Sequence, residues 1–314
     1  MKRFLVNISF FLLLVIFLTS LLYAVSDFLI KQRTQKLLKI RDDINIVFAG
    51  DSNVEGAVND SLISNSINIA QSGEAYLYTY VKLRNLLQYN SQINTVYIGF
   101  SFQNLIKSTE ERWLFQDQFV IEKIKNYNYL LGNMEKSLIM KHNPIAYLKG
   151  SVECILSNFP VILKSYSSTG IKDKIINFGG YEYNSRYKLQ EDIKMNSFSG
   201  QIFEKGPLQE KYLKMISDMC RQKSIKVVLF NTPKHKYFAT RFDKETQNSW
   251  ISLRKSLSQD SLLDLSMFTL PDSCFFDMDH LNCKGAAIFS KYLNEESHSG
   301  KKGSLTKTEV DKTN

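Results

Sequence analysis

Short apolar runs alternate with amphipathic segments along much of this chain of 314 residues. Four runs have the length and the Val- and Ile-rich composition of buried strands: residues 44–49, 66–70, 95–100 and 225–230. Residues 75–89 and 207–223 carry apolar side chains at helical spacing. This alternation predicts an α/β protein with a flavodoxin-like parallel sheet and helices on both of its faces.

The alternation is interrupted in the middle of the chain and resumes toward the C-terminus. Residues 262–265 predict a last short strand, and residues 245–258 and 284–294 predict two more helices. Residues 105–205 are rich in Tyr, Asn and Lys, and we interpret them as an insertion, first helical and then irregular, that covers the cleft side of the sheet. The α/β domain is therefore expected at 43–295, followed by a disordered tail at 296–314.

The N-terminus carries an apolar run, FLVNISFFLLLVIFLTSLLYAV, directly after Lys2 and Arg3. About twenty apolar residues span a bilayer as a helix, and a buried core helix of that length would show a polar face. A cleaved signal peptide is the alternative, because small residues lie near position 26. We favour an uncleaved anchor at 1–26, since apolar residues continue to Ile30, with a separate amphipathic juxtamembrane helix at 27–42.

The net charge of +9 raises the question of nucleic acid as a partner. The basic residues are scattered, except at positions 31–41 and in the tail, and no aromatic-interleaved basic stripe or zinc-finger pattern occurs, so we expect no nucleic-acid partner. The basic cluster after the apolar run would place the body in the cytoplasm by the positive-inside rule. We expect the extracytoplasmic side of a bacterial inner membrane instead, because a single N-terminal anchor commonly delivers a domain across the membrane. A cytoplasm-facing protein that recruits acidic partners remains an alternative.

The four cysteines are too few and too widely spaced for a disulfide scaffold, and no CxxC pair occurs. Cys274 and Cys283 could form a bridge in an oxidising compartment, or both could be buried thiols. The chain has no Walker loop, GxGxxG or HExxH pattern, so we expect no cofactor and no metal.

Two short segments predict chemistry at the carboxyl edge of the sheet. Gly50, Asp51 and Ser52 directly follow the first strand, where a serine can present its hydroxyl to a cleft. Asp277 and His280 lie in a loop before the last helix, and an Asp three residues before a His can hold the imidazole in the tautomer of a general base. Taken singly, each segment could instead be a helix cap or a surface turn.

Together these segments resemble the SGNH/GDSL hydrolase superfamily, which carries a GDS block after the first strand and a DxxH block before the last helix. A further stretch, NIAQSG at 68–73, resembles the family's N-x-A-x-S-G block. The resemblance implies that Ser52 is the nucleophile, His280 the general base and Asp277 its orienting acid. It also implies that the backbone N–H groups of Ser52 and Gly73 form an oxyanion hole.

The family's next block, GxND, is missing, because residues 99–104 read GFSFQN. Ser101, Gln103 and Asn104 are the candidates for the oxyanion donor that the family's Asn supplies. Losing one such donor costs about two to three decades in rate. The departure resembles membrane-anchored SGNH-like proteins of cell-surface polysaccharide O-acylation.

The expected function is that of a serine esterase or O-acyltransferase, which forms an acyl-serine on a cell-envelope glycan. Asn231, Lys234 and His235 follow a predicted strand and are candidates for binding an anionic or sugar substrate. The expected partners are an acylated or acyl-accepting glycan, the membrane and, by resemblance, a membrane-bound O-acyltransferase. A catalytically inactive SGNH-like scaffold or glycan-binding module is the alternative.

Overall fold

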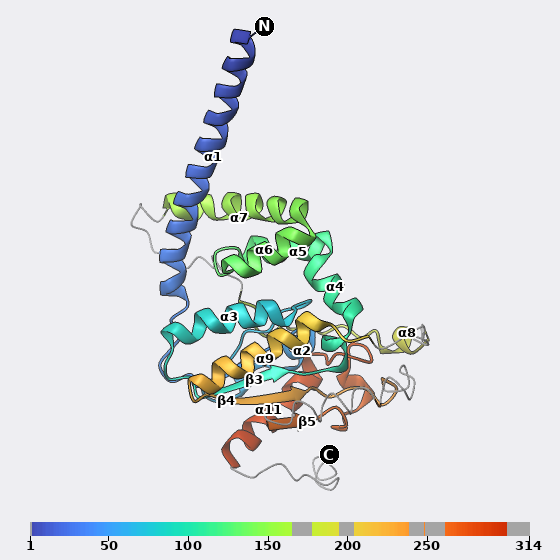
Figure 1. Ribbon diagram of the computed structural model, residues 1–314. Helices are drawn as coiled ribbons and strands as arrows, with labels where there is room; N and C mark the ends of the chain where they lie inside the picture. The colour runs from blue at the N-terminus through green and yellow to red at the C-terminus, as the bar shows by residue number, and fades with distance from the viewer. Residues whose placement is uncertain (1, 165–177, 195–203, 239–247, 249–260, 300–314) are drawn as a thin grey trace. The chain divides into compact units, whose positions relative to one another are not determined.

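The computed structural model describes residues 2–164, 178–194, 204–238, 248 and 261–299. It forms two compact units, drawn in Figure 1. An α/β unit comprises residues 41–80, 91–110 and 178–314, and a helical unit comprises residues 1–40, 81–90 and 111–177.

The α/β unit contains β1 (Ile46–Ala49), α2 (Ser52–Ala57), η1 (Asp60–Leu62), β2 (Ser66–Asn68), β3 (Thr95–Gly99), η2 (Phe102–Leu105), α8 (Leu189–Lys194), α9 (Pro207–Gln222), β4 (Lys226–Asn231), β5 (Ser261–Asp264), η4 (Asp272–Cys274) and α11 (Cys283–Ser299). The helical unit contains α1 (Lys2–Leu37), α5 (Asp117–Tyr127), α6 (Asn133–His142) and α7 (Pro144–Lys164). Two helices, α3 (Tyr76–Tyr89) and α4 (Lys107–Phe115), each run from one unit into the other.

The sheet has five strands in the order β2-β1-β3-β4-β5, and every neighbouring pair is parallel. Val47 of β1 lies opposite Val96 of β3, and Val96 lies opposite Val227 of β4. This is the strand order of flavodoxin-like folds. The α/β class and the strands predicted from the apolar runs are confirmed.

Aromatic side chains fill the core on one face of the sheet. Phe48 stacks on Tyr97 with ring centroids 4.8 Å apart, and Phe230 meets Phe48 edge-on at 5.9 Å. Phe289 of α11 belongs to the same buried cluster, so α11 and α2 cover this face. Because strand side chains alternate, Val96 points to the opposite face, where α9 packs against β4. The sheet is therefore covered by helices on both sides, as predicted.

Two predicted boundaries differ from those of the structure. Helix α1 runs unbroken from Lys2 to Leu37, so the separate juxtamembrane helix predicted at 27–42 was wrong. The reason is that no Gly or Pro interrupts this stretch. Helix α11 continues to Ser299, beyond the expected domain end at 295.

The insertion is helical through α4, α5, α6 and α7, as the sequence predicted, and residues 178–188 are irregular. The helix predicted at 245–258 and the end of the tail, 300–314, lie outside the described residues.

The close approach of Gly99 to the side chain of Val54 can be tested by mutation. A Cβ atom added to Gly99 would lie 2.4 Å from Cγ2 of Val54. We therefore expect Gly99→Ala to lower the free energy of unfolding by about 1–3 kcal/mol, the usual cost of overpacking. Urea unfolding of the full chain in detergent micelles measures this change.

Val54→Ala provides the matched control, because it removes the atom that the new methyl group meets. In that background Gly99→Ala should cost clearly less than in the parent chain. Equal costs in the two backgrounds would contradict the assignment of the strain to this contact.

Candidate active site

The turn that presents Ser52 depends on two glycines. Gly50 has φ +151°, and a Cβ atom there would lie 2.8 Å from Cγ2 of Val54 and 3.2 Å from Cα of Gly99. The chain can therefore leave β1 close to the end of β3 and enter α2 directly. Asp51 caps α2, and Ser52 is its first residue. The backbone N–H of a first helical residue has no carbonyl partner within the helix.

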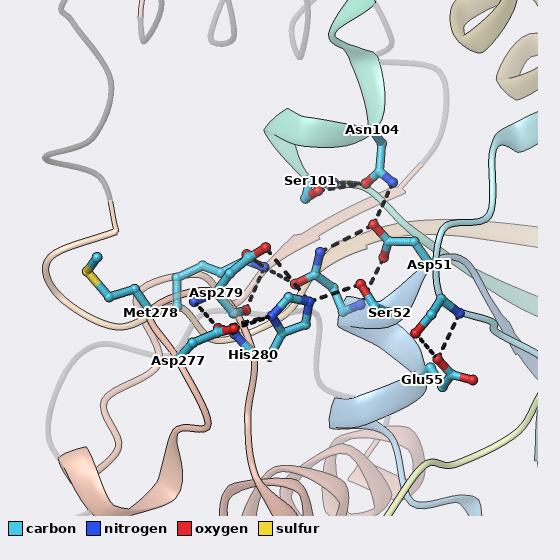
Figure 2. Close-up of polar contacts among 12 residues, drawn as sticks. Asp51, Ser52, Glu55, Ser101, Asn104, Asp277, Met278, Asp279 and His280 are labelled. Carbon is cyan, nitrogen blue, oxygen red and sulfur yellow. Dashed lines mark hydrogen bonds and ion pairs between the residues drawn. The ribbon is translucent and has the colours of Figure 1, made fainter. Parts of the chain in front are cut away.

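The hydroxyl of Ser52 contacts a histidine, and the other ring nitrogen of that histidine contacts a carboxylate. Oγ of Ser52 lies 2.9 Å from Nε2 of His280, and Nδ1 of His280 lies 3.0 Å from Oδ1 of Asp277 (Figure 2). Residues 228 positions apart in the sequence are thus in hydrogen-bond contact. The arrangement is that of a Ser-His-Asp triad, in which the histidine can accept the serine proton and the carboxylate orients the ring.

Asp277 also folds its own loop. Its Oδ1 atom accepts the backbone N–H of Asp279 at 2.8 Å and that of His280 at 2.7 Å. Burial raises the pKa of Asp277, but the hydrogen bond and charge of His280 and these two N–H donors outweigh it, so the pKa lies below its ordinary value. The same carboxylate therefore caps the turn and orients the imidazole.

Asp51 connects the nucleophile turn to η2, the segment that follows β3. The buried Asp51 carboxylate accepts the backbone N–H of Asn53 at 3.0 Å and Nδ2 of Asn104 at 2.9 Å. The Oδ1 atom of Asn104 in turn accepts the backbone N–H of Ser101 at 2.8 Å and its hydroxyl at 2.7 Å (Figure 2). Of the three candidate donors in this block, Asn104 is thus the one bonded directly to the nucleophile turn, while Gln103 is half-buried.

The NIAQSG block lies against the same turn. The backbone N–H of Gln71 donates to the carbonyl of Gly50 at 3.0 Å, and Nδ2 of Asn68 donates to the carbonyl of Val58 at 2.7 Å. Gly73 is buried and has φ +62°, a conformation that favours glycine. The oxyanion roles of Gly73 and of the Ser52 N–H stay predictions.

The three candidate substrate-binding residues after β4 have different positions. Lys234 is buried, and its Nζ atom lies 2.5 Å from Oδ1 of Asp279 and 2.5 Å from Oδ1 of Asn53, so it is engaged inside the protein. His235 is buried beside Phe275, its Nε2 atom 3.2 Å from a carboxylate oxygen. These two residues support the loops of the site. Substrate binding by Lys234 and His235 stays a prediction.

Asn231, the third candidate, lies at the carboxyl end of β4. Its Oδ1 atom is buried and has no hydrogen-bond partner among the described residues. An unsatisfied buried amide oxygen can accept a donor from a bound molecule. Substrate binding by Asn231 stays a prediction.

The ion pair of Lys234 and Asp279 was not predicted from the sequence, and it alters the charge around the base. Burial lowers the pKa of His280, but the negative charge of Asp279 and the hydrogen bond and charge of Asp277 outweigh it and raise the pKa to about 9. The positive charge of Lys234 partly opposes this rise. The sequence offered one indication of this pair: Lys234 follows the strand β4, and Asp279 lies in the loop before α11, and these two segments meet at one edge of the sheet.

Residues 178–194 pack against the chain segments that form the candidate site. The backbone N–H of Gly180 donates to the carbonyl of Ala70 at 3.0 Å, and that of Glu182 donates to the carbonyl of Glu55 at 3.1 Å. A Cβ atom on Gly179 would lie 1.9 Å from the carbonyl oxygen of Ala70, so only glycine fits there. The FGGYEY sequence is the signal by which this contact could have been predicted.

All four cysteines are free thiols, so Cys274 and Cys283 are not bridged in this structure. Within the described ranges, no group of three or more His, Cys, Asp or Glu side chains could hold a metal ion.

The strand order and the site together define an α/β protein with a flavodoxin-like parallel sheet and a Ser-His-Asp triad at its carboxyl edge. A protein-family model that carries no description of activity matches residues 188–299. No curated protein matches the sequence.

Three solved structures are similar to this chain at low identity. The first is a candidate acylhydrolase from Bacteroides fragilis, at 12% identity and TM-score 0.38, with 84% of this chain and 92% of the other covered. The second is a protein described as a candidate platelet activating factor from Streptococcus pneumonia, at 13% and 0.35, with 90% and 98% covered. The third is a GDSL-like lipase from Bacteroides thetaiotaomicron, at 11% and 0.36, with 86% and 99% covered. The fold assignment rests on the strand order, not on these matches.

The raised pKa of His280 predicts how the reactivity of Ser52 depends on pH. A base must be deprotonated to accept the serine proton, so the rate of labelling by a fluorophosphonate should rise with pH and level off above about 9. Asp279→Asn should move the midpoint to lower pH. Lys234→Met should move it to higher pH, because it leaves the charge of Asp279 unopposed.

Labelling rates measured from neutral to alkaline pH test this pair of variants. Opposite shifts support the charge assignment, and circular dichroism checks that both variants fold. A midpoint that stays in place in two folded variants would show that Asp279 and Lys234 do not control the base.

Proposed function

We propose that this protein is a serine-dependent esterase or O-acyltransferase that forms an acyl-enzyme on Ser52. The observation that carries the proposal is the 2.9 Å contact of Ser52 Oγ with His280 Nε2, aligned by Asp277. A structural serine has no need of a histidine whose other nitrogen is held by a carboxylate.

The proposed chemistry proceeds in two halves. Nε2 of His280 takes the proton of Ser52 as Oγ attacks an ester carbonyl, and the carbonyl oxygen becomes an oxyanion near the N–H groups of Ser52 and Gly73. The C–O bond to the alcohol breaks, and His280 returns its proton to that alcohol. Water or a glycan hydroxyl then loses a proton to His280, attacks the acyl-serine and releases the acid or the new ester, which restores the Ser52 hydroxyl.

The envelope location and the glycan substrate are part of the same proposal. Within the described residues, α1 is the one helix long and apolar enough to cross a membrane, over Arg3–Ser26. A signal sequence would pass the same test. Retention of α1 is favoured because Tyr23, near the end of the apolar stretch, accepts a hydrogen bond from Nδ2 of Asn128 at 3.0 Å. We propose an uncleaved anchor with the site on the extracytoplasmic side, and a membrane-bound O-acyltransferase as partner.

A non-catalytic scaffold or glycan-binding module is the second candidate. One observation favours it: Asn104, the amide of the third block, is bonded to Asp51 and Ser101. The Nδ2 group of Asn104 donates to Asp51, and loss of this amide as a third oxyanion donor would lower turnover.

Labelling of the full chain in detergent with a fluorophosphonate tests the proposal. We expect the parent to label, Ser52→Ala to lose labelling entirely and His280→Ala to lose at least about a hundredfold in rate, because the serine then lacks its base. Asp277→Asn should slow labelling strongly, since the amide no longer favours the correct tautomer.

His142→Ala is the matched control, because His142 is exposed and its contacts are with Leu138 of its own helix and with the ring of Phe115, outside the candidate site. It should label like the parent. A folded parent chain that never labels would favour the scaffold.

Asn104→Ala tests the third block separately. If the Asn104 amide serves the oxyanion or holds Asp51 for it, the labelling rate should fall by about two to three decades. Gln103→Ala, one residue away, should stay within a few-fold of the parent. Equal rates for the two variants would remove Asn104 from the site.

A further inference from the structure

Helix α7 presents an exposed apolar face that the proposed chemistry does not use. Ile145, Leu148, Val152 and Leu156 are between 55% and 78% exposed. They recur three, four and four residues apart, which places them on one stripe of the helix. Four large aliphatic side chains in one exposed row are not the scattered apolar residues of an ordinary surface.

The opposite face of α7 is fully used in packing. Ala146, Tyr147, Ser151 and Cys154 are buried. A Cβ atom on Gly150 would lie 2.8 Å from Cβ of Ile124, so α7 is pressed closely against α5. The helix therefore cannot rotate to hide its apolar stripe without losing this contact.

The position of α7 along α1 is determined by a hydrogen-bonded chain within the helical unit. Asn128, just after α5, donates from Nδ2 to the hydroxyl of Tyr23 at 3.0 Å, and its Oδ1 accepts the hydroxyl of Tyr147 at 3.3 Å. The hydroxyls of Tyr147 and Tyr23 thus meet on one amide, and Tyr23 lies less than one turn from the end of the apolar span at Ser26. If α1 spans a membrane, α7 lies at the depth where the bilayer meets water.

The direction of the stripe agrees with this depth. Figure 1 shows α7 crossing α1, with α5 and α6 on the side of α7 away from the N-terminal end of α1. The buried face of α7 packs on α5, so the exposed stripe turns toward the side on which the apolar span continues. Lys149, at the edge of the stripe, is exposed and can extend its charge to lipid head groups.

We propose that α7 is an interfacial helix whose stripe of Ile145, Leu148, Val152 and Leu156 lies in the bilayer surface beside the spanning helix α1. The inference rests on the anchor in the proposed function and does not depend on the chemistry at Ser52. A stripe of this kind buries its side chains at the boundary of head groups and acyl chains. It would hold the helical unit flat on the membrane at two points, α1 and α7.

Depth-dependent quenching of tryptophan in the full chain tests the proposal. Leu148→Trp and Val152→Trp are reconstituted separately into phosphatidylcholine vesicles whose acyl chains carry bromine. The emission of the parent chain, with Trp113 and Trp250, is subtracted. We expect the added emission of both variants to be blue-shifted and mostly lost when bromine lies near the head groups.

Ser157→Trp is the matched control, because Ser157 is exposed on the same helix but lies off the stripe. Its added emission should keep its intensity in brominated vesicles. Absence of quenching at both 148 and 152 overturns the proposal, whether the tryptophans are in water or shielded by a second copy of the chain. Equal quenching at 148, 152 and 157 also overturns it, since the face would then have no orientation.

Alkaline carbonate extraction separates this inference from the anchor. An anchored chain stays in the vesicles, and failure of quenching then refutes the α7 proposal alone. A chain that carbonate extracts contradicts the anchor and removes the depth argument with it. Labelling at Ser52 is measured on the same vesicles and reports separately on the proposed chemistry.

Discussion

The buried carboxylate of Asp51 is the interaction on which the candidate site depends. It caps α2, so that Ser52 is the first residue of the helix, and it accepts a hydrogen bond from the amide of Asn104 in η2, which follows β3. A buried carboxylate is tolerated only where hydrogen-bond donors satisfy it. The nucleophile turn and the segment after β3 must therefore stay within hydrogen-bond distance of each other. The close approach of Gly50 and Gly99 is the backbone counterpart of the same constraint.

The charges around His280 give the stability of the fold and the reactivity of the site opposite dependences on pH. The folded-state pKa of about 9 lies above the ordinary value of 6.5, so the protonated ring stabilises the fold fully below about pH 6.5. That contribution is lost as the pH rises through about 9. The base becomes available over the same interval, which means that the loop 277–280 is least stable where the site is most reactive.

Much of the fold could be predicted because its cause is local. Strand positions followed from short Val- and Ile-rich runs. The pairing of Ser52 with His280 followed from the resemblance of the GDS and DxxH blocks to those of the SGNH/GDSL superfamily. The role of Lys234 could not be predicted, because the sequence does not show whether a lysine after a strand is buried against a partner. The unbroken α1 was missed because the change from apolar to polar composition near position 26 was interpreted as the end of a helix, although such a change does not break a helix.

The helical unit is assembled from three separate stretches of the chain, 1–40, 81–90 and 111–177. Deleting the first stretch, the usual route to a soluble fragment, would therefore leave the other two in place and remove the tyrosine that Asn128 binds. The stripe on α7 would remain, now without the neighbouring helix that keeps it at a membrane. A truncated protein of this kind is expected to self-associate through that stripe, and detergent or mutation of Leu148 would be needed to keep it monomeric.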